Sequence, residues 1–249
     1  MTPERAAGES MVRPVTLSLP FTGRWLVQNS PARRVPSHGS DLFGERYAID
    51  FVGVDDRGRT AAHRDLSTVF GTEPAERFFG FGRPVLAPAA GTVTTVHFGE
   101  EDHEARRSQF ALVPYALGQA ARVRSGRSAV AGNHLVIALP DGAGYVALVH
   151  LRAGSVRVSV GETVTLGQPM ASCGNSGNST QPHLHLQVMD STDLSVAHGV
   201  PLVFRRYRES RGAADAVHRE SGIPTEGAVV EPWPPVPTTG RKNEPRFIF

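Results

Sequence analysis

Alternation of polar and apolar residues is the clearest pattern along this chain, and it predicts short strands separated by turns. Residues 183–188 read His-Leu-His-Leu-Gln-Val, so one face of the predicted strand is polar and the other apolar. Other predicted strands lie within residues 15–19, 23–28, 46–53, 84–96, 133–139, 144–151, 157–166, 169–173, 200–204 and 227–230. Gly- and Pro-containing turns separate many of these runs, as expected for strands joined by short connections.

These elements predict an all-β domain with mostly antiparallel sheets. The chain has 249 residues, which suffices for one large domain with insertions. The predicted organisation is a flexible lead-in at 1–13, a β domain at 14–204 with insertions at 54–80 and 97–131, and a C-terminal extension at 205–249. A short helix is expected in the second insertion, around residues 108–121.

Charge and cysteine content narrow the classes of function. The formal net charge is +2 and the basic residues are scattered, so a nucleic-acid partner is not expected. Cys173 is the only cysteine, which excludes an intramolecular disulfide and a cysteine-based zinc cluster. No apolar run reaches the roughly 20 residues that a membrane helix needs. No secretory signal is recognised, so the expected location is cytoplasmic, or extracellular or in the cell wall if another export route exists.

Candidate metal ligands occur on two of the predicted strands. His183 and His185 share the polar face of their strand, and paired imidazoles on a rigid element suit a metal site or acid–base chemistry. Asp50 lies within an apolar strand, where a buried carboxylate is costly unless it is paired or bound to a metal. The alternative is that these are ordinary surface or hydrogen-bonded side chains.

Two further histidines are candidates because of their positions. His150 stands at the end of the predicted strand 144–151, and His38 lies in a loop rich in Pro and Arg. The candidates come from separate segments, so only the fold can bring them together.

Five segments together resemble a known family, the lysostaphin-like zinc endopeptidases that cut peptide cross-links in bacterial cell walls. They are Pro-Val-Leu-Ala-Pro-Ala-Ala-Gly-Thr-Val at 84–93, Gly-Asn-His-Leu-Val-Ile at 132–137, Tyr-Val-Ala-Leu-Val-His-Leu at 145–151, Val-Gly-Glu-Thr-Val-Thr-Leu-Gly-Gln at 160–168 and Gly-Asn-Ser-Gly-Asn-Ser-Thr-Gln-Pro-His-Leu-His at 174–185. The last segment is the most specific. The resemblance implies the duplicated-hybrid-motif type of sandwich or barrel.

The resemblance also implies roles for particular residues. His185 and Asp50 correspond to zinc ligands, and His150 and His183 correspond to catalytic histidines. The family's remaining ligand is a histidine four residues before the aspartate, but Arg46 stands there and cannot bind zinc. His38, twelve residues before Asp50, is the natural replacement, with His63 as the alternative.

The predicted function is that of a metalloendopeptidase with one Zn²⁺ per chain, held by His38, Asp50 and His185. A zinc-activated water, assisted by His150 and His183, would hydrolyse a peptide bond, by resemblance in peptidoglycan-type cross-links. The residues expected to line the groove for this peptide substrate are Asn175, Ser176, Asn178, Ser179 and Thr180. The alternatives are a metal-free family member that acts as a binding or regulatory module, and a cytoplasmic peptidase with a non-wall substrate.

Overall fold

A computed structural model describes residues 13–63, 65, 68, 71–106, 130–212 and 215–234. Thirteen strands are named in these ranges. They are β1 (Val15–Leu17), β2 (Trp25–Gln28), β3 (Ile49–Gly53), β4 (Pro84–Leu86), β5 (Gly91–His97), β6 (Asn133–Ala138), β7 (Tyr145–Leu151), β8 (Thr163–Val164), β9 (Pro169–Ser172), β10 (Leu184–Met189), β11 (Leu202–Ser210), β12 (Val217–Gly222) and β13 (Val229–Pro232). Three short 3-10 helices join them: η1 (Leu42–Tyr47), η2 (Ala75–Arg77) and η3 (Pro140–Gly142).

Most strands belong to one large sheet, in the order β1-β11-β13-β2-β3-β10-β7-β6-β5-β8, with β12 paired to β11. A second sheet consists of β4 and β9 alone. The β1–β11 pair is parallel and the other pairs are antiparallel. The predicted all-β, mostly antiparallel class is therefore confirmed. Within the described ranges, no helix has the length and apolar character needed to cross a membrane.

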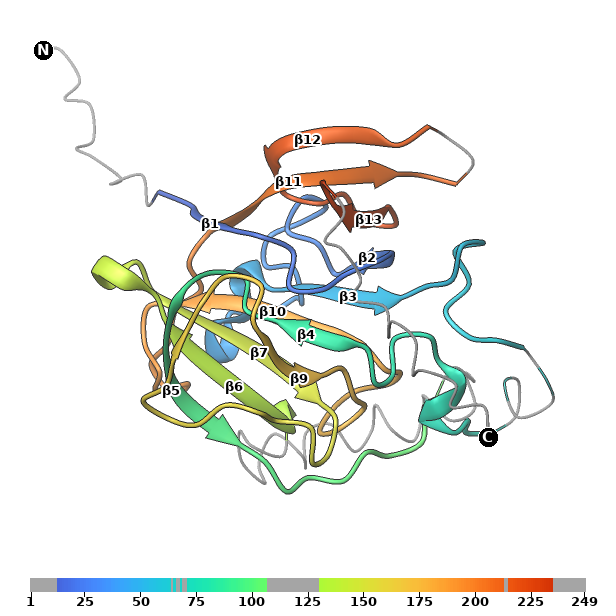
Figure 1. Cartoon of the computed structure of the whole chain (residues 1–249), viewed down its shortest axis with the longest axis horizontal. Coiled ribbons are helices and arrows are strands. Elements are labelled where there is room, and N and C mark those ends of the chain that lie inside the picture. The colour runs from blue at the N-terminus through green and yellow to red at the C-terminus, as the bar shows by residue number, and fades with distance from the viewer. Residues whose placement is uncertain are drawn as a thin grey trace, which may run out of the picture.

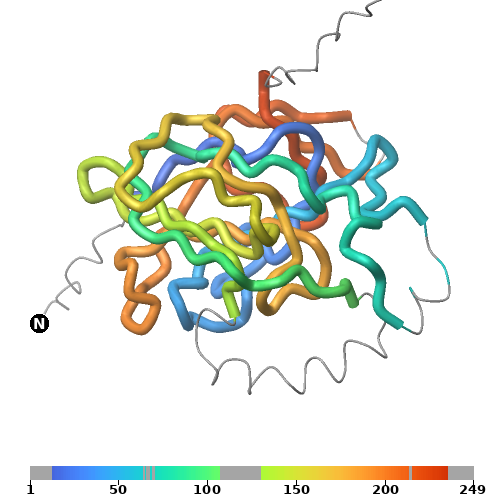
Figure 2. The backbone as a smooth tube through the Cα atoms, turned by 60° about the horizontal axis from the view of Figure 1, so that its bottom comes forward, coloured from blue at the N-terminus to red at the C-terminus, as the bar shows by residue number. Residues whose placement is uncertain are grey.

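Strands from the two ends of the chain lie side by side in the sheet. The blue β1 and β2 adjoin the orange and red β11 and β13 in both views (Figures 1 and 2). β11 runs from Leu202 to Ser210, and β13 connects it to β2. This pairing adds the last described strands to the same sheet, whereas the division into a domain and an extension stays a prediction.

The main hydrophobic core lies between the large sheet and the β4–β9 pair. Leu184 and Leu186 of β10 belong to the same buried cluster as Val85 of β4 and Met170 of β9. Because side chains alternate along a strand, a β10 that faces the core with its leucines turns His185 to the opposite face. The core thus fixes the side of the sheet on which the polar residues of β10 gather.

Some predicted strands are shorter in the structure. Only Thr163–Val164 forms a strand within the predicted run 157–166. The segment before it makes single backbone bonds, such as Arg157 N to Met170 O, instead of a ladder. The predicted strand 46–53 begins at Ile49, because η1 occupies the preceding residues and the Ala48 N–H donates to Glu45 O to close that turn.

Other predictions lie outside the described residues. These are the helix around 108–121, most of the lead-in at 1–13 and the end of the extension from residue 235.

Candidate metal centre

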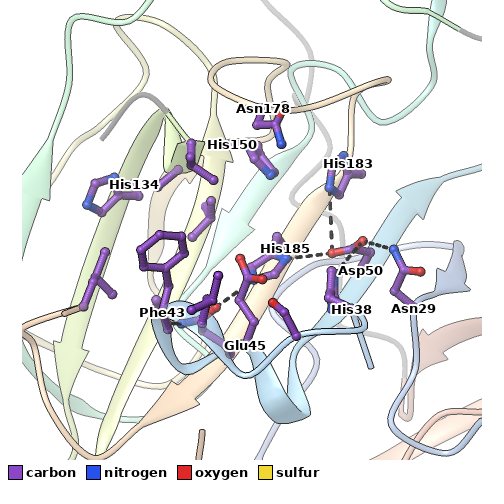
Figure 3. A pocket seen from close by; sticks show the side chains of 18 of the residues that line it. Asn29, His38, Phe43, Glu45, Asp50, His134, His150, Asn178, His183 and His185 are labelled. Carbon is purple, nitrogen blue, oxygen red and sulfur yellow. Dashed lines mark hydrogen bonds and ion pairs between the residues drawn. The ribbon is translucent and has the colours of Figure 1, made fainter. Parts of the chain in front are cut away.

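The structure brings three of the predicted ligands together. One donor atom from each of His38, Asp50 and His185 lies within 4.8 Å of the others. His38 Nε2 is 3.1 Å from Asp50 Oδ2, and His185 Nδ1 is 2.9 Å from Asp50 Oδ1. The carboxylate therefore lies between two imidazoles, one on each oxygen (Figure 3).

Strand register places two members of this group. In the antiparallel β3–β10 pair, Asp50 is directly opposite His185, so their side chains leave the sheet on the same face. Both residues are only 5% exposed, which makes an unpaired carboxylate here very unfavourable. Asn29, which follows β2, donates from Nδ2 to Asp50 Oδ2 at 2.8 Å and adds a further partner.

A loop anchored on η1 carries His38 to the same point. The Ser37 N–H donates to Arg46 O at 3.1 Å, and the Ser37 hydroxyl donates to Glu45 O at 3.3 Å. The same hydroxyl lies 3.0 Å from His38 Nδ1, which leaves His38 Nε2 on the side of Asp50. His38 thus approaches the carboxylate from a loop, in place of a neighbouring strand residue.

The two other positions considered for this ligand lie away from the group. Arg46 Nη1 donates to both oxygens of the Asp41 carboxylate, and the Arg46 side chain is 43% exposed. His63 is exposed and lies 3.9 Å from Asp65. Of the two histidines weighed from sequence, His38 is the one that meets Asp50.

Hydrogen bonds set which nitrogen His185 presents to Asp50. Its Nε2–H donates to Gln187 Oε1 at 2.9 Å, and Gln187 Nε2 donates to Phe43 O at 2.7 Å. The amide is held in one orientation by the Phe43 carbonyl, so His185 Nδ1 remains for Asp50 or for a cation.

Electrostatics at this point favour a positive charge between the carboxylate and the imidazoles. Burial alone would raise the pKa of Asp50, but the nearby His183 and His38 and the bond from His185 hold it well below its usual range. Burial alone would lower the pKa of His185, but the bond and charge of Asp50 raise it to about 9. A divalent cation can replace the proton that these groups share, so the donor set fits a metal such as zinc.

The Gln187 bond gives a testable consequence. Gln187→Ala is expected to lower zinc affinity by about 10–100-fold, because the His185 ring loses the acceptor that orients it. Affinity is measured by competition with a chromogenic chelator. Gln168→Ala is the matched control, since Gln168 bonds Glu162 and Thr165 instead. An unchanged affinity in the Gln187 variant would contradict this role.

His150 and His183 lie beside the three-residue group. Their ring centroids are 4.7 Å apart, and the His150 ring is 6.0 Å from that of His185. His150 Nδ1 donates to Ser176 O at 2.9 Å, and His183 Nδ1 donates to Gln181 O at 2.8 Å. Burial lowers the pKa of both rings, so each is neutral at pH 7 with Nε2 as a proton acceptor.

An unusual backbone conformation turns His150 toward this group. Strict alternation predicts that His150 faces away from Ala147 and Val149. Its φ angle is +62°, a left-handed value that is rare for a residue with a side chain, and the β6–β7 register shifts opposite it, between Asn133 and Leu135. This irregularity brings the ring to the face that carries His185.

The five loop residues predicted to line a groove divide into two groups. Asn178 and Thr180 line the cavity around the metal centre. The other three are fully buried: Asn175, Ser176 and Ser179. The Ser176 hydroxyl donates to Leu151 O, and its carbonyl accepts from His150. These buried residues hold the loop and His150 in position instead of facing the cavity.

The cavity has a volume of about 930 Å³ and contains residues that sequence reasoning did not select. Asn29, Phe43, Glu45 and His134 line it (Figure 3). The His134 side chain donates from Nδ1 to Gly132 O at 2.7 Å. The sequence offered one signal for Asn29. It directly follows the predicted strand 23–28, which is the strand before that of Asp50 in the chain and pairs with it in the structure.

An all-β domain with two imidazoles and a carboxylate converging at the wall of a cavity has the donor set of a metal-dependent hydrolase. The sequence model of Peptidase family M23 matches residues 114–197. This segment contains β6 to β10 and carries His150, His183 and His185. The resemblance to the lysostaphin-like peptidases is thus confirmed for residues 114–197, which match the model of that family.

Several solved structures are similar to this chain at low sequence identity. The catalytic domain of the antimicrobial peptidase lysostaphin from Staphylococcus simulans is 18% identical, with a TM-score of 0.36, over 72% of this chain and 88% of that one. LytU is 20% identical, with a TM-score of 0.36, over 78% and 88%. A zinc-containing peptidase from Vibrio cholerae is 20% identical, with a TM-score of 0.28, over 57% and 46%. No curated protein matches the chain.

Proposed function

We propose that this chain is a zinc-dependent metalloendopeptidase that hydrolyses peptide bonds in peptidoglycan-type cross-links. The match to Peptidase family M23 supports a metallopeptidase. The observation that carries the finer proposal is the convergence of His38, Asp50 and His185, with two neutral histidines beside them. The cross-link substrate rests on the family resemblance of residues 174–185.

His38 Nε2, His185 Nδ1 and one oxygen of Asp50 would hold the metal. Two nitrogens and a carboxylate are a common zinc set in hydrolases and leave one coordination position for water or substrate. When bound there, zinc lowers the pKa of a water to roughly 7 and polarises the scissile carbonyl. Asn29 and Gln187 keep Asp50 and His185 oriented toward the metal position.

His150 and His183 would move the proton. In each neutral ring the hydrogen is on Nδ1, which donates it to a backbone carbonyl, so Nε2 carries no hydrogen and can accept one. One of these Nε2 atoms accepts the proton of the attacking water and delivers it to the leaving nitrogen as the C–N bond breaks. Water is thereby divided between the two products: its oxygen goes to the carbonyl carbon and a proton goes to the amine.

Metal analysis combined with hydrolysis tests the proposal. The purified protein is expected to contain about one zinc per chain and to release new amino groups from purified peptidoglycan. A chelator should abolish the release, and added Zn²⁺, but not Mg²⁺, should restore it. His185→Ala should lose both zinc and hydrolysis, and retained hydrolysis in that variant would refute the mechanism.

The same experiment separates the two alternatives. A folded protein without zinc that binds peptidoglycan without cleaving it is the metal-free binding module. A zinc-containing protein that cleaves other peptides but leaves peptidoglycan intact is a peptidase with a non-wall substrate. Either result would replace the proposed function.

A further inference from the structure

The cavity beside the metal centre contains a carboxylate that does not belong to the group of three ligands. Glu45 of η1 lines the cavity, and Figure 3 includes it among the side chains around the metal centre. Its charge contributes to the raised pKa of His185, so the carboxylate lies close enough to act on that ring. A group bound beside the metal would therefore meet a second negative charge in addition to that of Asp50.

The backbone of Glu45 is held firmly against the sheet. Its carbonyl accepts from the Ala48 N–H at 3.0 Å and from the Ser37 hydroxyl at 3.3 Å. The preceding residue, Gly44, has a φ of +77°, and a Cβ added there would lie 2.8 Å from Met189 Cγ. Only glycine allows η1 to approach β10 so closely. The position of Glu45 at the cavity is therefore set by the packing of η1 on β10.

The Glu45 carboxylate has no partner of opposite charge among the described residues. Asp50 is hydrogen-bonded on both oxygens, whereas no hydrogen bond or ion pair within the described ranges reaches the Glu45 side chain. The next residue, Arg46, donates to Asp41 instead. Glu45 is partly buried, and a carboxylate that loses water without gaining a partner is unfavourable.

The other described residues that line the cavity do not neutralise this charge. None of them is Lys or Arg, and the carboxylates among them are those of Asp50 and Glu45. Glu45 is also outside the group whose donor atoms all lie within 4.8 Å of one another. Its carboxylate is therefore available to a ligand that enters the cavity, and a cation complements it best.

We propose that Glu45 is a specificity-determining residue that binds the free ammonium group of a diamino residue near the scissile bond. The inference rests on the proposed endopeptidase function and names the substrate group that the cavity favours. A peptide cross-link is made at residues with a second amine, and each such residue whose second amine is not acylated carries an ammonium. The proposed class of substrate therefore supplies the cation that Glu45 lacks.

The expected effect of this contact is large enough to measure. A hydrogen bond between an ammonium and a carboxylate improves binding by about 10–100-fold over a neutral group of similar shape. Much of that difference arises because the neutral group takes water from the carboxylate and gives no hydrogen bond in return. The cavity volume of about 930 Å³ lies within the usual range for ligand sites.

The first test measures binding without hydrolysis. Nα-acetyl-lysine methylamide and its Nε-acetylated form are titrated into zinc-loaded protein that carries ¹³C-labelled glutamate. The carboxyl NMR signal of Glu45 is identified by its absence in Glu45→Gln. The ammonium compound is expected to shift this signal and to bind at least about tenfold more tightly. Equal affinities, or shifts confined to other glutamates, would overturn the inference.

Two variants give the matched comparison. Glu45→Gln keeps the size of the side chain and removes its charge, so the affinity for the ammonium compound should fall to that for the acetylated one. Glu76→Gln makes the same change on η2, at an exposed residue that does not line the cavity, and should keep the preference. Loss of the preference in both variants, or in neither, would overturn the role of Glu45. Loss of zinc in Glu45→Gln would also overturn it, by showing that this carboxylate holds the metal.

Hydrolysis of paired peptides separates this inference from the proposed function. The peptides differ only in whether a lysine side chain is free or acetylated, and the lysine is placed in turn at the two positions on either side of the scissile bond. A preference for the free amine of about tenfold or more in kcat/KM, lost in Glu45→Gln through a higher KM, supports both statements. Equal cleavage of every pair overturns the role of Glu45 alone. Cleavage of no peptide by the zinc-loaded protein overturns the endopeptidase, and the Glu45 carboxyl signal then decides the ammonium site independently.

Discussion

Replacing His38 with alanine is expected to remove bound zinc and abolish hydrolysis, whereas the same change at His63 leaves both intact. His38 Nε2 lies 3.1 Å from Asp50, while His63 is exposed and outside the group of three. Removing a direct ligand should lower zinc affinity by more than the roughly 10–100-fold cost of removing a ligand's hydrogen-bonding partner. Two of three protein ligands would remain, and the water position would lose its geometry.

Zinc content by atomic absorption and the rate of peptidoglycan hydrolysis are measured on the same preparations. His63→Ala is the matched control because it removes an imidazole from the alternative position. A second variant, Arg46→His combined with His38→Ala, restores the family's usual ligand residue in sequence. It is not expected to regain zinc, because the position 46 side chain extends toward Asp41. Full zinc content in His38→Ala would show that another residue completes the site.

The part of the site that lies within one regular strand could be predicted from sequence. The alternating run 183–188 forms β10 from Leu184 to Met189, and its leucines enter the core as expected. Alternation alone then puts His183 and His185 on one side, because successive side chains on a strand face opposite ways. Asp50 could also be predicted from sequence, because it is a charged residue within the otherwise apolar strand β3.

The parts of the site that depend on loops and irregular backbone could not be predicted from the alternation of polar and apolar residues. His38 reaches Asp50 because its loop is bonded to η1, a turn in which Phe43 and Gly44 both have positive φ angles. No local periodicity encodes that contact. His150 is the complementary case: its residue type indicated chemistry, but its direction depends on a left-handed φ of +62° that breaks the alternation of β7.

Strand register was a further unknown. Gln187, Ala147 and Val136 are neighbours because the pairing of β10, β7 and β6 aligns these positions. A shift of one residue in either pair would turn the small apolar side chains away from the cavity. The sequence identifies each strand as apolar, but it does not state which residues become neighbours, so these contacts emerge only from the three-dimensional pairing.

Removing either His150 or His183 is expected to separate metal binding from catalysis. His183→Ala and His150→Ala should each retain about one zinc per chain, while kcat falls by about 10²–10⁴-fold. Both rings adjoin the group of three without belonging to it, so their loss leaves all three ligands in place. Each variant loses the Nε2 atom that, in the proposed mechanism, would accept the water's proton.

The comparison of zinc content with rate decides between a proton-transfer role and a ligand role for each ring. His198→Ala serves as the control, because His198 is highly exposed and pairs with Asp190 away from the centre. The two roles are harder to separate for His183 than for His150, because His183 Nε2 lies only 3.7 Å from Asp50 Oδ1. If zinc and activity decline together in His183→Ala, this ring helps to hold the metal and His150 alone remains to carry the proton. If zinc stays while the rate falls, His185 of β10 and His183, the residue just before β10, perform different tasks. His185 then binds the metal, and His183 moves the proton.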